Sequence, residues 1–123
     1  NDGYIPAGSI ISNIESMAIY LQLYMNNTIS YLPMTYSKIK DINANQAAYE
    51  AMNIRMDSVG MTWMLDNKNN IIWHNGATTD FNSYIGFTQD RQRGVVILSN
   101  LNANDKISMT VIGAKLLTEQ FDL

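Results

Sequence analysis

Cysteine is absent from this 123-residue chain, which excludes a disulfide framework and any thiolate metal site. No apolar run is long enough to cross a membrane as a helix. The 8 Lys and Arg residues are scattered along a chain that also carries 11 Asp and Glu residues, and the net charge is −3. Because the cations form no basic patch, we expect no nucleic-acid partner.

Histidine occurs once, and no group of His, Asp and Glu has the spacing of metal ligands. We therefore expect neither a metal ion nor another cofactor. Apolar residues make up 46% of the chain and charged residues 15%, a composition typical of a globular protein. A chain of this length can bury one core, so residues 1–123 are expected to lie in a single domain.

The first half of the chain has one clear helical pattern. Ser12 and Glu15 fit a capping box, and Asn26-Asn27 can adopt the left-handed conformation that ends a helix. Between them an apolar residue recurs every three or four positions, which predicts a helix over about 13–26. The residues that carry this pattern are Ile14, Met17, Ala18, Leu21 and Met25.

The middle of the chain is less regular. Residues 28–43 contain Pro33 among Ser, Thr and Tyr and predict a surface loop. Residues 44–52 are rich in helix formers and predict a short helix. Near the end, a wide apolar stripe predicts a helix over about 105–120, capped by Asn104 or Asp105 and packed on a sheet.

Four apolar segments separated by polar turns predict an antiparallel meander. The last of them is nearly all apolar, which favours a central position in the sheet with both faces covered. The expected class is α+β, with a meander of about four strands and with the N-terminal and C-terminal helices packed on it. The four predicted strands are residues 59–65, 71–74, 81–88 and 94–99.

A polar cluster, His74-Asn75-Gly76, falls at the end of the second predicted strand, and the loop Ala77-Thr78-Thr79-Asp80 follows it. The stretch from Ile71 to Asn100 resembles the C-terminal motif region of the penicillin-recognising serine hydrolases, above all the class C β-lactamases and their esterase and peptidase relatives. Those proteins carry Lys-Thr-Gly or His-x-Gly on a strand edge. The similar residues continue through Phe81, Ser83-Tyr84-Ile85-Gly86-Phe87 and the strand that ends in Ser99-Asn100, and Tyr4-Ile5-Pro6-Ala7-Gly8 also resembles the family.

The resemblance implies a partial β-lactamase/transpeptidase-like fold and acyl transfer on a β-lactam, a D-Ala peptide or an ester. It also implies that residues 1–123 are the C-terminal part of a longer protein of the cell envelope, periplasmic or secreted. The partners expected are a small-molecule or peptide substrate, the N-terminal part of the same protein, and a second copy in a homodimer. Two departures, His74 in place of lysine and Thr79-Asp80 in place of two glycines, weigh against classical β-lactamase activity.

By resemblance, His74 hydrogen-bonds the substrate or a proton-transfer tyrosine, Gly76 lets substrate approach the backbone, and the Ala77 N–H is an oxyanion donor. Alternatively, His74 is an exposed polar residue and Gly76 forms a plain turn. Three further side chains can bind a carboxylate or a peptide, or can simply meet water: Asn75, Thr78 and Thr79. A fourth candidate lies at Asn104, where the family often places a substrate-binding asparagine.

The nucleophile of the family is not identified in this chain. Ser37-x-x-Lys40 and Tyr24-x-Asn26 match the family's short motifs, but their order is reversed, and Tyr24 lies within the predicted helix. We therefore reject both matches. The aromatic residues are expected to pack in the core rather than bind substrate: Trp63, Trp73, Tyr84 and Phe87. A second hypothesis is a non-catalytic module that binds peptidoglycan-like peptides or a partner strand.

Overall fold

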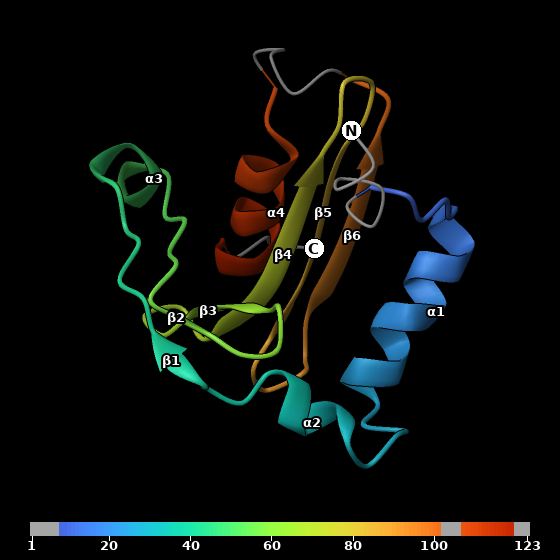
Figure 1. The fold of residues 1–123 in the computed structure, drawn as a ribbon, viewed down its shortest axis with the longest axis horizontal. Helices are drawn as coiled ribbons and strands as arrows, with labels where there is room; N and C mark the ends of the chain where they lie inside the picture. Colours follow the sequence, from blue (N-terminus) through green and yellow to red (C-terminus); the bar gives the residue numbers. More distant parts are fainter. Residues whose placement is uncertain (1–7, 102–106, 120–123) are drawn as a thin grey trace.

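The fold is one antiparallel sheet with a helix on each face. The computed structural model describes residues 8–101 and 107–119. Within these residues six strands lie in the order β1-β2-β3-β4-β5-β6, so each strand pairs with its neighbours in sequence. Helix α1 (Ile14–Met25) covers one face and α4 (Met109–Thr118) the other (Figure 1). The predicted α+β class is confirmed, with six strands in place of about four.

The strands β1–β3 are short, and the strands β4–β6 on the other side of the sheet are longer. The strands are β1 (Lys40–Asp41), β2 (Ser58–Val59), β3 (Met64–Asp66), β4 (Ile71–Ala77), β5 (Asn82–Thr88) and β6 (Gly94–Ser99). Two further helices, α2 (Leu32–Thr35) and α3 (Ala47–Ala51), lie in the connections. The predicted helix over 44–52 is thus confirmed as α3, whereas the predicted loop over 28–43 also contains α2 and β1.

The prediction of a single strand over 59–65 is wrong, because the chain turns back within it. Ser58 pairs with Leu65, and the Gly60 N–H donates to the Trp63 carbonyl across the turn. Thr62 has a positive φ of 71°, which the apolar pattern does not indicate. A Cβ at Gly60 would lie 2.6 Å from the Thr35 carbonyl oxygen, so glycine is needed for the hairpin to pack against α2.

The helix ends differ from the predictions by a few residues. Asn13, not Ser12, caps α1, because its side chain accepts a hydrogen bond from the Ser16 N–H. Asn27 has a φ of 51°, which confirms the left-handed end of this helix. Helix α4 begins at Met109 rather than residue 105, and its cap is Ser108. The expected caps Asn104 and Asp105 lie outside the described residues.

Strand β6 is not central, contrary to the prediction. Within the described residues it pairs with β5 alone and forms one edge of the sheet. Its apolar run has another cause, since Val96 packs against the core under α1 while Val95 and Ile97 pack against the core under α4. A nearly all-apolar strand sequence therefore indicates that both faces of the strand are covered. It does not indicate whether the strand has one or two neighbouring strands.

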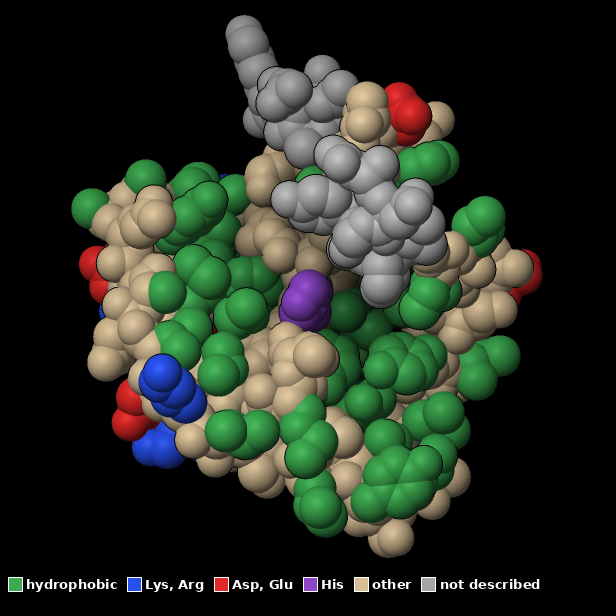
Figure 2. Space-filling model, in the orientation of Figure 1, with side chains coloured by type: hydrophobic (Ala, Val, Ile, Leu, Met, Phe, Trp, Pro, Cys, Tyr) green, Lys and Arg blue, Asp and Glu red, His purple; other side chains and the backbone are tan. Residues whose placement is uncertain are grey.

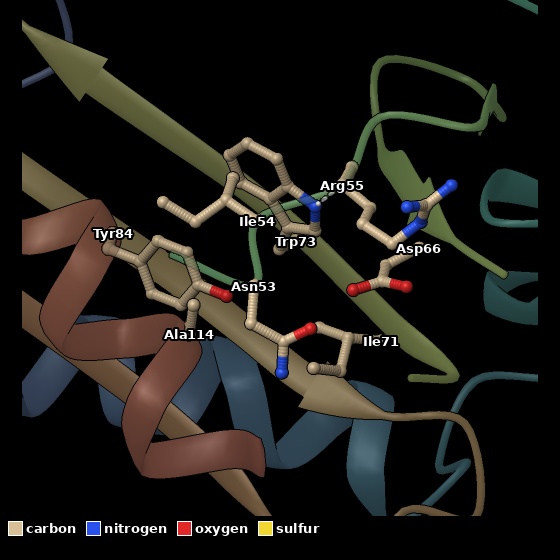
Figure 3. A pocket seen from close by; sticks show the side chains of 8 residues that line it. All are labelled: Asn53, Ile54, Arg55, Asp66, Ile71, Trp73, Tyr84 and Ala114. Carbon is tan, nitrogen blue, oxygen red and sulfur yellow. Dashed lines mark hydrogen bonds between the residues drawn. The ribbon is translucent and has the colours of Figure 1, made fainter. Parts of the chain in front are cut away.

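Each face of the sheet has its own core. The core under α1 is aromatic, with Tyr24, Trp63 and Phe87 in edge or tilted contact at centroid distances of 5.2–5.7 Å. The core under α4 contains Trp73 stacked on Tyr84. The predicted core roles of Trp63, Trp73, Tyr84 and Phe87 are confirmed. Figure 3 shows the residues that line a cavity beside this stacked pair. The cavity has a volume of about 10 Å³ and is too small for a substrate.

Candidate active-site wall

The second half of β4 has a free edge. Strand β3 pairs with β4 only at Ile71–Trp73, whereas β5 pairs with the whole of β4 from Ile71 to Ala77. Residues His74–Ala77 therefore have no strand on their β3 side within the described part of the chain. We call this side of His74–Ala77 the open edge. All four residues are exposed to solvent, as a surface that meets a ligand must be.

The hydrogen-bond pattern of the sheet gives the direction of each backbone group at the open edge. The Thr78 N–H donates to the Phe81 carbonyl, so Thr78 faces β5. In an antiparallel strand, alternate residues face opposite neighbours, so Gly76 also faces β5 while Asn75 and Ala77 face away from it. Trp73 lies four residues before Ala77, so both residues face the same side of β4, and Trp73 pairs with β3. The Ala77 N–H is therefore directed outward at the open edge, as an oxyanion donor requires.

His74 stands on the face of the sheet that carries α1. Its neighbour two residues earlier, Ile72, lies in the core under α1, and side chains alternate along a strand. The cross-strand partner of His74 is Ile85, which packs against the same core. Figure 2 shows the histidine side chain at the surface with hydrophobic side chains beside it. An imidazole in this position is accessible to a ligand at the open edge.

Gly76 lies within β4, so the alternative of a plain turn at this position is wrong. Its cross-strand partner is Ser83, whose hydroxyl donates to the Gly76 carbonyl at 3.4 Å. A Cβ at Gly76 would lie 3.0 Å from the Ser83 oxygen, closer than a relaxed contact allows. Glycine avoids this contact, and the residue is exposed to solvent.

Asn75 points to the opposite face, toward α4. Its side-chain Nδ2 donates to the Thr110 hydroxyl at 2.9 Å, and Thr110 is only 8% exposed. No local pattern predicts this contact, because 35 residues separate the two positions. A threonine inside an otherwise apolar helical stripe was the one available signal.

The other predicted site residues lie around the loop after β4. Thr78 and Thr79 are exposed, and the Thr78–Phe81 bond closes the loop. Gly8 approaches this loop from the other end of the chain, since a Cβ on it would lie 3.2 Å from Thr78 Cγ2. The structure thus brings His74–Thr79 together at one end of the sheet, while Asn104 lies outside the described residues.

The two literal motif matches have structural roles. The Ser37 hydroxyl donates to the Pro33 carbonyl at 2.9 Å, and Lys40 lies on β1, at the edge of the sheet away from β4 and β5. Tyr24 is buried in the core under α1. Their surroundings support rejecting both matches, because Tyr24 is part of the core and the Ser37 hydroxyl is bonded to the backbone of α2.

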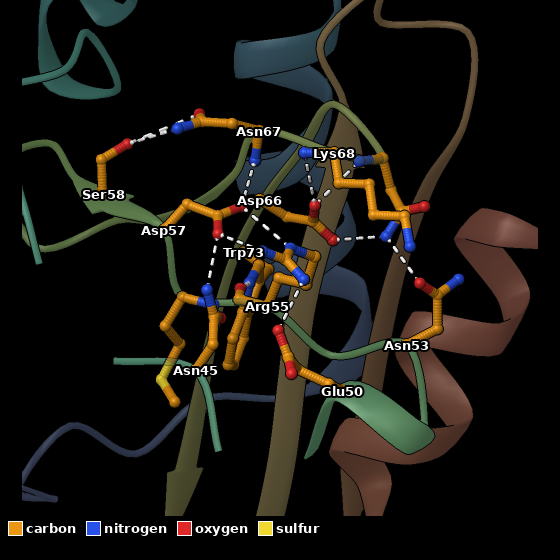
Figure 4. Close-up of polar contacts among 12 residues, drawn as sticks. Asn45, Glu50, Asn53, Arg55, Asp57, Ser58, Asp66, Asn67, Lys68 and Trp73 are labelled. Carbon is orange, nitrogen blue, oxygen red and sulfur yellow. Dashed lines mark hydrogen bonds and ion pairs between the residues drawn. The ribbon is translucent and has the colours of Figure 1, made fainter. Parts of the chain in front are cut away.

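Sequence analysis missed a polar network that anchors the segment before β2. Arg55 donates to both Asp57 carboxylate oxygens, at 3.2 and 2.8 Å, and to Glu50 at 2.9 Å (Figure 4). Asp57 also accepts from the Asn45 side chain and the Asn67 N–H. Burial acts to raise the pKa of Asp57, but these hydrogen bonds outweigh it and hold the pKa below its ordinary value. The network fixes the paired half of the sheet rather than the open edge.

Two hollows in the described part of the chain lie away from the open edge. A shallow one of about 440 Å³ is formed by the β3–β4 and β5–β6 turns, at the opposite end of the sheet from Thr78, and is lined by Asn69, Asn70, Thr88, Gln89 and Asp90. Neither this depression nor the small cavity beside Trp73 includes residues 74–79. The open edge is therefore an exposed strand edge rather than part of either hollow.

A sheet flanked by two helices, with a polar strand end exposed along one edge, is the arrangement that the resemblance implies. The family model described as Beta-lactamase matches residues 1–117. The chain therefore belongs to the Beta-lactamase family, and the resemblance to penicillin-recognising serine hydrolases is confirmed. No curated protein matches the chain.

In residues 8–101 and 107–119, no three His, Asp or Glu side chains are grouped so that they could hold a metal ion. Over the same ranges, no helix has the length and apolar character needed to span a membrane.

Proposed function

We propose that this chain is the C-terminal portion of a serine hydrolase that acts by acyl transfer on a β-lactam, a D-Ala peptide or an ester. In this proposal the chain supplies one wall of the active site and an oxyanion N–H, and the nucleophile comes from the N-terminal portion of the same protein. Such a protein would work in the cell envelope or after secretion, as the resemblance implies.

The observation that carries the proposal is the outward direction of the Ala77 N–H. An oxyanion donor must be free of the sheet's own hydrogen bonds and must point at the reacting carbonyl. The alternation of backbone directions along β4 meets the first condition, because Gly76 and Thr78 face β5 while Ala77 faces the open edge. The exposed imidazole of His74, on the same strand, would hydrogen-bond the substrate or the proton-transfer tyrosine.

The second candidate function is peptide binding without catalysis. An unpaired strand edge can accept an extended peptide as an additional strand, and the N–H and carbonyl groups of Asn75 and Ala77 face that edge. Thr79-Asp80, where the family usually has two glycines, also favours this alternative. The open edge serves both candidates, so the presence of a nucleophile decides between them.

Labelling by a fluorescent penicillin, followed by ester hydrolysis, tests the proposal on the protein that contains this chain together with its N-terminal portion. The most informative variant is Ala77→Pro, which removes the outward N–H and leaves the bonds to β5 in place. We expect an about 100-fold loss of the acylation rate, which is typical for one oxyanion donor.

His74→Ala should also slow labelling. Gln89→Ala is the matched control, since Gln89 is exposed in the turn at the far end of the sheet. If the protein neither reacts with penicillin nor hydrolyses esters, acyl transfer is wrong. Strand addition by a D-Ala peptide, measured by calorimetry, would then be the function to examine.

A further inference from the structure

One side chain at the open edge is tied to the interior rather than aimed at a ligand. Asn75 lies between His74 and Gly76, and its amide donates to the hydroxyl of Thr110 in the first turn of α4. Thr110 is 8% exposed, so little water competes for its hydroxyl on the side of α4. A hydrogen bond between two side chains on different elements fixes their separation, provided that one element is itself immobile.

Helix α4 is such an immobile element. Met109, Ala114 and Leu117 are each 5% exposed and lie in the core under this helix. Gly113 presses against Tyr84 so closely that a Cβ there would overlap the tyrosine ring. The first turn is also held by Ser108, whose side chain accepts from the Val111 N–H. Thr110 therefore offers Asn75 a fixed anchor.

The second half of β4 needs such an anchor, because among the described residues it has a neighbouring strand on one side only. The first half is held between β3 and β5, whereas His74–Ala77 pairs with β5 alone in the described residues. Strand ends with one neighbour open more readily than strands with two. The Asn75–Thr110 bond is a second constraint on this segment, and it acts two residues before the outward N–H of Ala77.

We infer that Asn75 is a positioning residue, which acts through Thr110 to hold the Ala77 N–H in line with the reacting carbonyl. This inference rests on the proposed acyl-transfer function, and it replaces the interpretation of Asn75 as a ligand of the substrate carboxylate. A donor that is displaced by a fraction of an ångström stabilises the transition state less while ground-state binding changes little. Loss of the bond therefore lowers kcat and leaves KM unchanged.

The test uses Thr110→Val, which keeps the shape of the side chain and removes the hydroxyl. Its matched control is Thr118→Val in the last turn of the same helix, where the hydroxyl donates only to the Ala114 carbonyl. Thr110→Ser restores the hydroxyl and should restore the behaviour of the unmodified protein. For Thr110→Val we expect an about tenfold fall in kcat for ester hydrolysis or penicillin acylation, with KM unchanged.

Combining Thr110→Val with Asn75→Ala distinguishes positioning from substrate binding. If Asn75 acts through Thr110, the double variant loses no more kcat than either single variant, because both remove the same bond. If Asn75 instead binds substrate, Asn75→Ala raises KM and its effect adds to that of Thr110→Val. The second result overturns the inference while leaving the proposed function intact.

Amide hydrogen exchange tests the same inference without any activity. The Gly76 N–H faces β5, so its exchange rate reports how often the end of β4 opens. Thr110→Val should raise this rate about fivefold, the effect of losing one hydrogen bond, and Thr118→Val should not. Unchanged exchange at Gly76 in Thr110→Val refutes the positioning role. A protein that shows the exchange effect but no acyl transfer refutes the proposed function, and leaves only the anchoring of the end of β4 by Asn75 and Thr110.

Discussion

The two halves of β4 are built from the same strand but in different ways. Ile71–Trp73 is buried, paired on both sides, and flanked by the network around Asp57. Within the described residues, His74–Ala77 is exposed and paired with β5 alone, and Asn75 bonds this segment to Thr110 in α4. The first half carries the stability of the sheet, and the second half exposes backbone groups that a ligand can use. Substitutions at the two halves should therefore affect different properties.

The largest difference is expected between two phenylalanines of the same hairpin. Phe87 is paired opposite Ile72 and is 0% exposed, whereas Phe81 lies beside the open edge and is 61% exposed. Phe87→Ala should lower the free energy of unfolding by about 3–5 kcal/mol, because it leaves a cavity among Tyr24, Tyr36 and Trp63.

Phe81→Ala is the matched control and should change the free energy by less than about 0.5 kcal/mol. Urea unfolding followed by circular dichroism measures both variants. A large loss in Phe81→Ala would mean that the open end contributes to the core, which removes the distinction between the two halves.

An intermediate effect on the free energy of unfolding is expected from adding a methyl group where α4 packs on the sheet. Gly113→Ala raises helix propensity, which alone would stabilise the protein by up to about 1 kcal/mol. The added Cβ overlaps the ring of Tyr84, which is buried between α4 and Trp73. Overpacking should win, with a net loss of about 1–3 kcal/mol in thermal or urea unfolding. A stabilised Gly113→Ala protein would show that α4 can shift, and it would then be a poor anchor for Asn75.

A smaller effect is expected at the polar network, and it depends on pH. Asp57→Asn keeps the shape of the side chain but weakens the bonds from Arg55, and should cost about 1 kcal/mol at pH 7. The pKa of Asp57 is lower in the folded protein than its ordinary value, so its contribution is present above about pH 4. The contribution is lost as the pH falls through the lowered folded-state pKa.

Urea unfolding of the two proteins at pH 7, 5 and 3 measures this difference. The gap between unmodified protein and Asp57→Asn should be constant from pH 7 to 5 and should narrow at pH 3. Asp41→Asn is the control, because the Lys38–Asp41 pair is exposed. A gap that widens on acidification would contradict the sign of the pKa change.

The sequence was sufficient where local pattern determines structure. The periodicity from Ile14 to Met25 predicted α1, and the alternation and turns between Ile71 and Ser99 predicted the β4–β5–β6 meander. The sequence was insufficient where one backbone angle decides the path. Residues 59–65 form a hairpin instead of one strand, because Thr62 adopts a left-handed conformation and Gly60 approaches Thr35. The pattern of apolar residues indicates neither effect.

The same limit applies to the candidate site. The motif predicts the position of the polar cluster at 74–79, but the directions of its groups depend on the register with β5. Only that register assigns Ala77 to the open edge and Asn75 to the face of α4. The Asn75–Thr110 bond and the Arg55–Asp57 pair join residues whose partners no local pattern specifies.

The smallest effect on the free energy of unfolding is expected for His74→Ala, although His74 has a proposed role in contacting substrate. Ile72 and His74 lie two residues apart on the same face of β4, one buried and one exposed. Ile72→Ala should cost about 2–5 kcal/mol in urea unfolding, whereas His74→Ala should stay within about 0.5 kcal/mol and still slow acylation. A His74→Ala protein that is destabilised as much as Ile72→Ala would make His74 a packing residue. Full stability with reduced acylation would place its contribution in the contact with substrate, because the strand that carries it is unchanged.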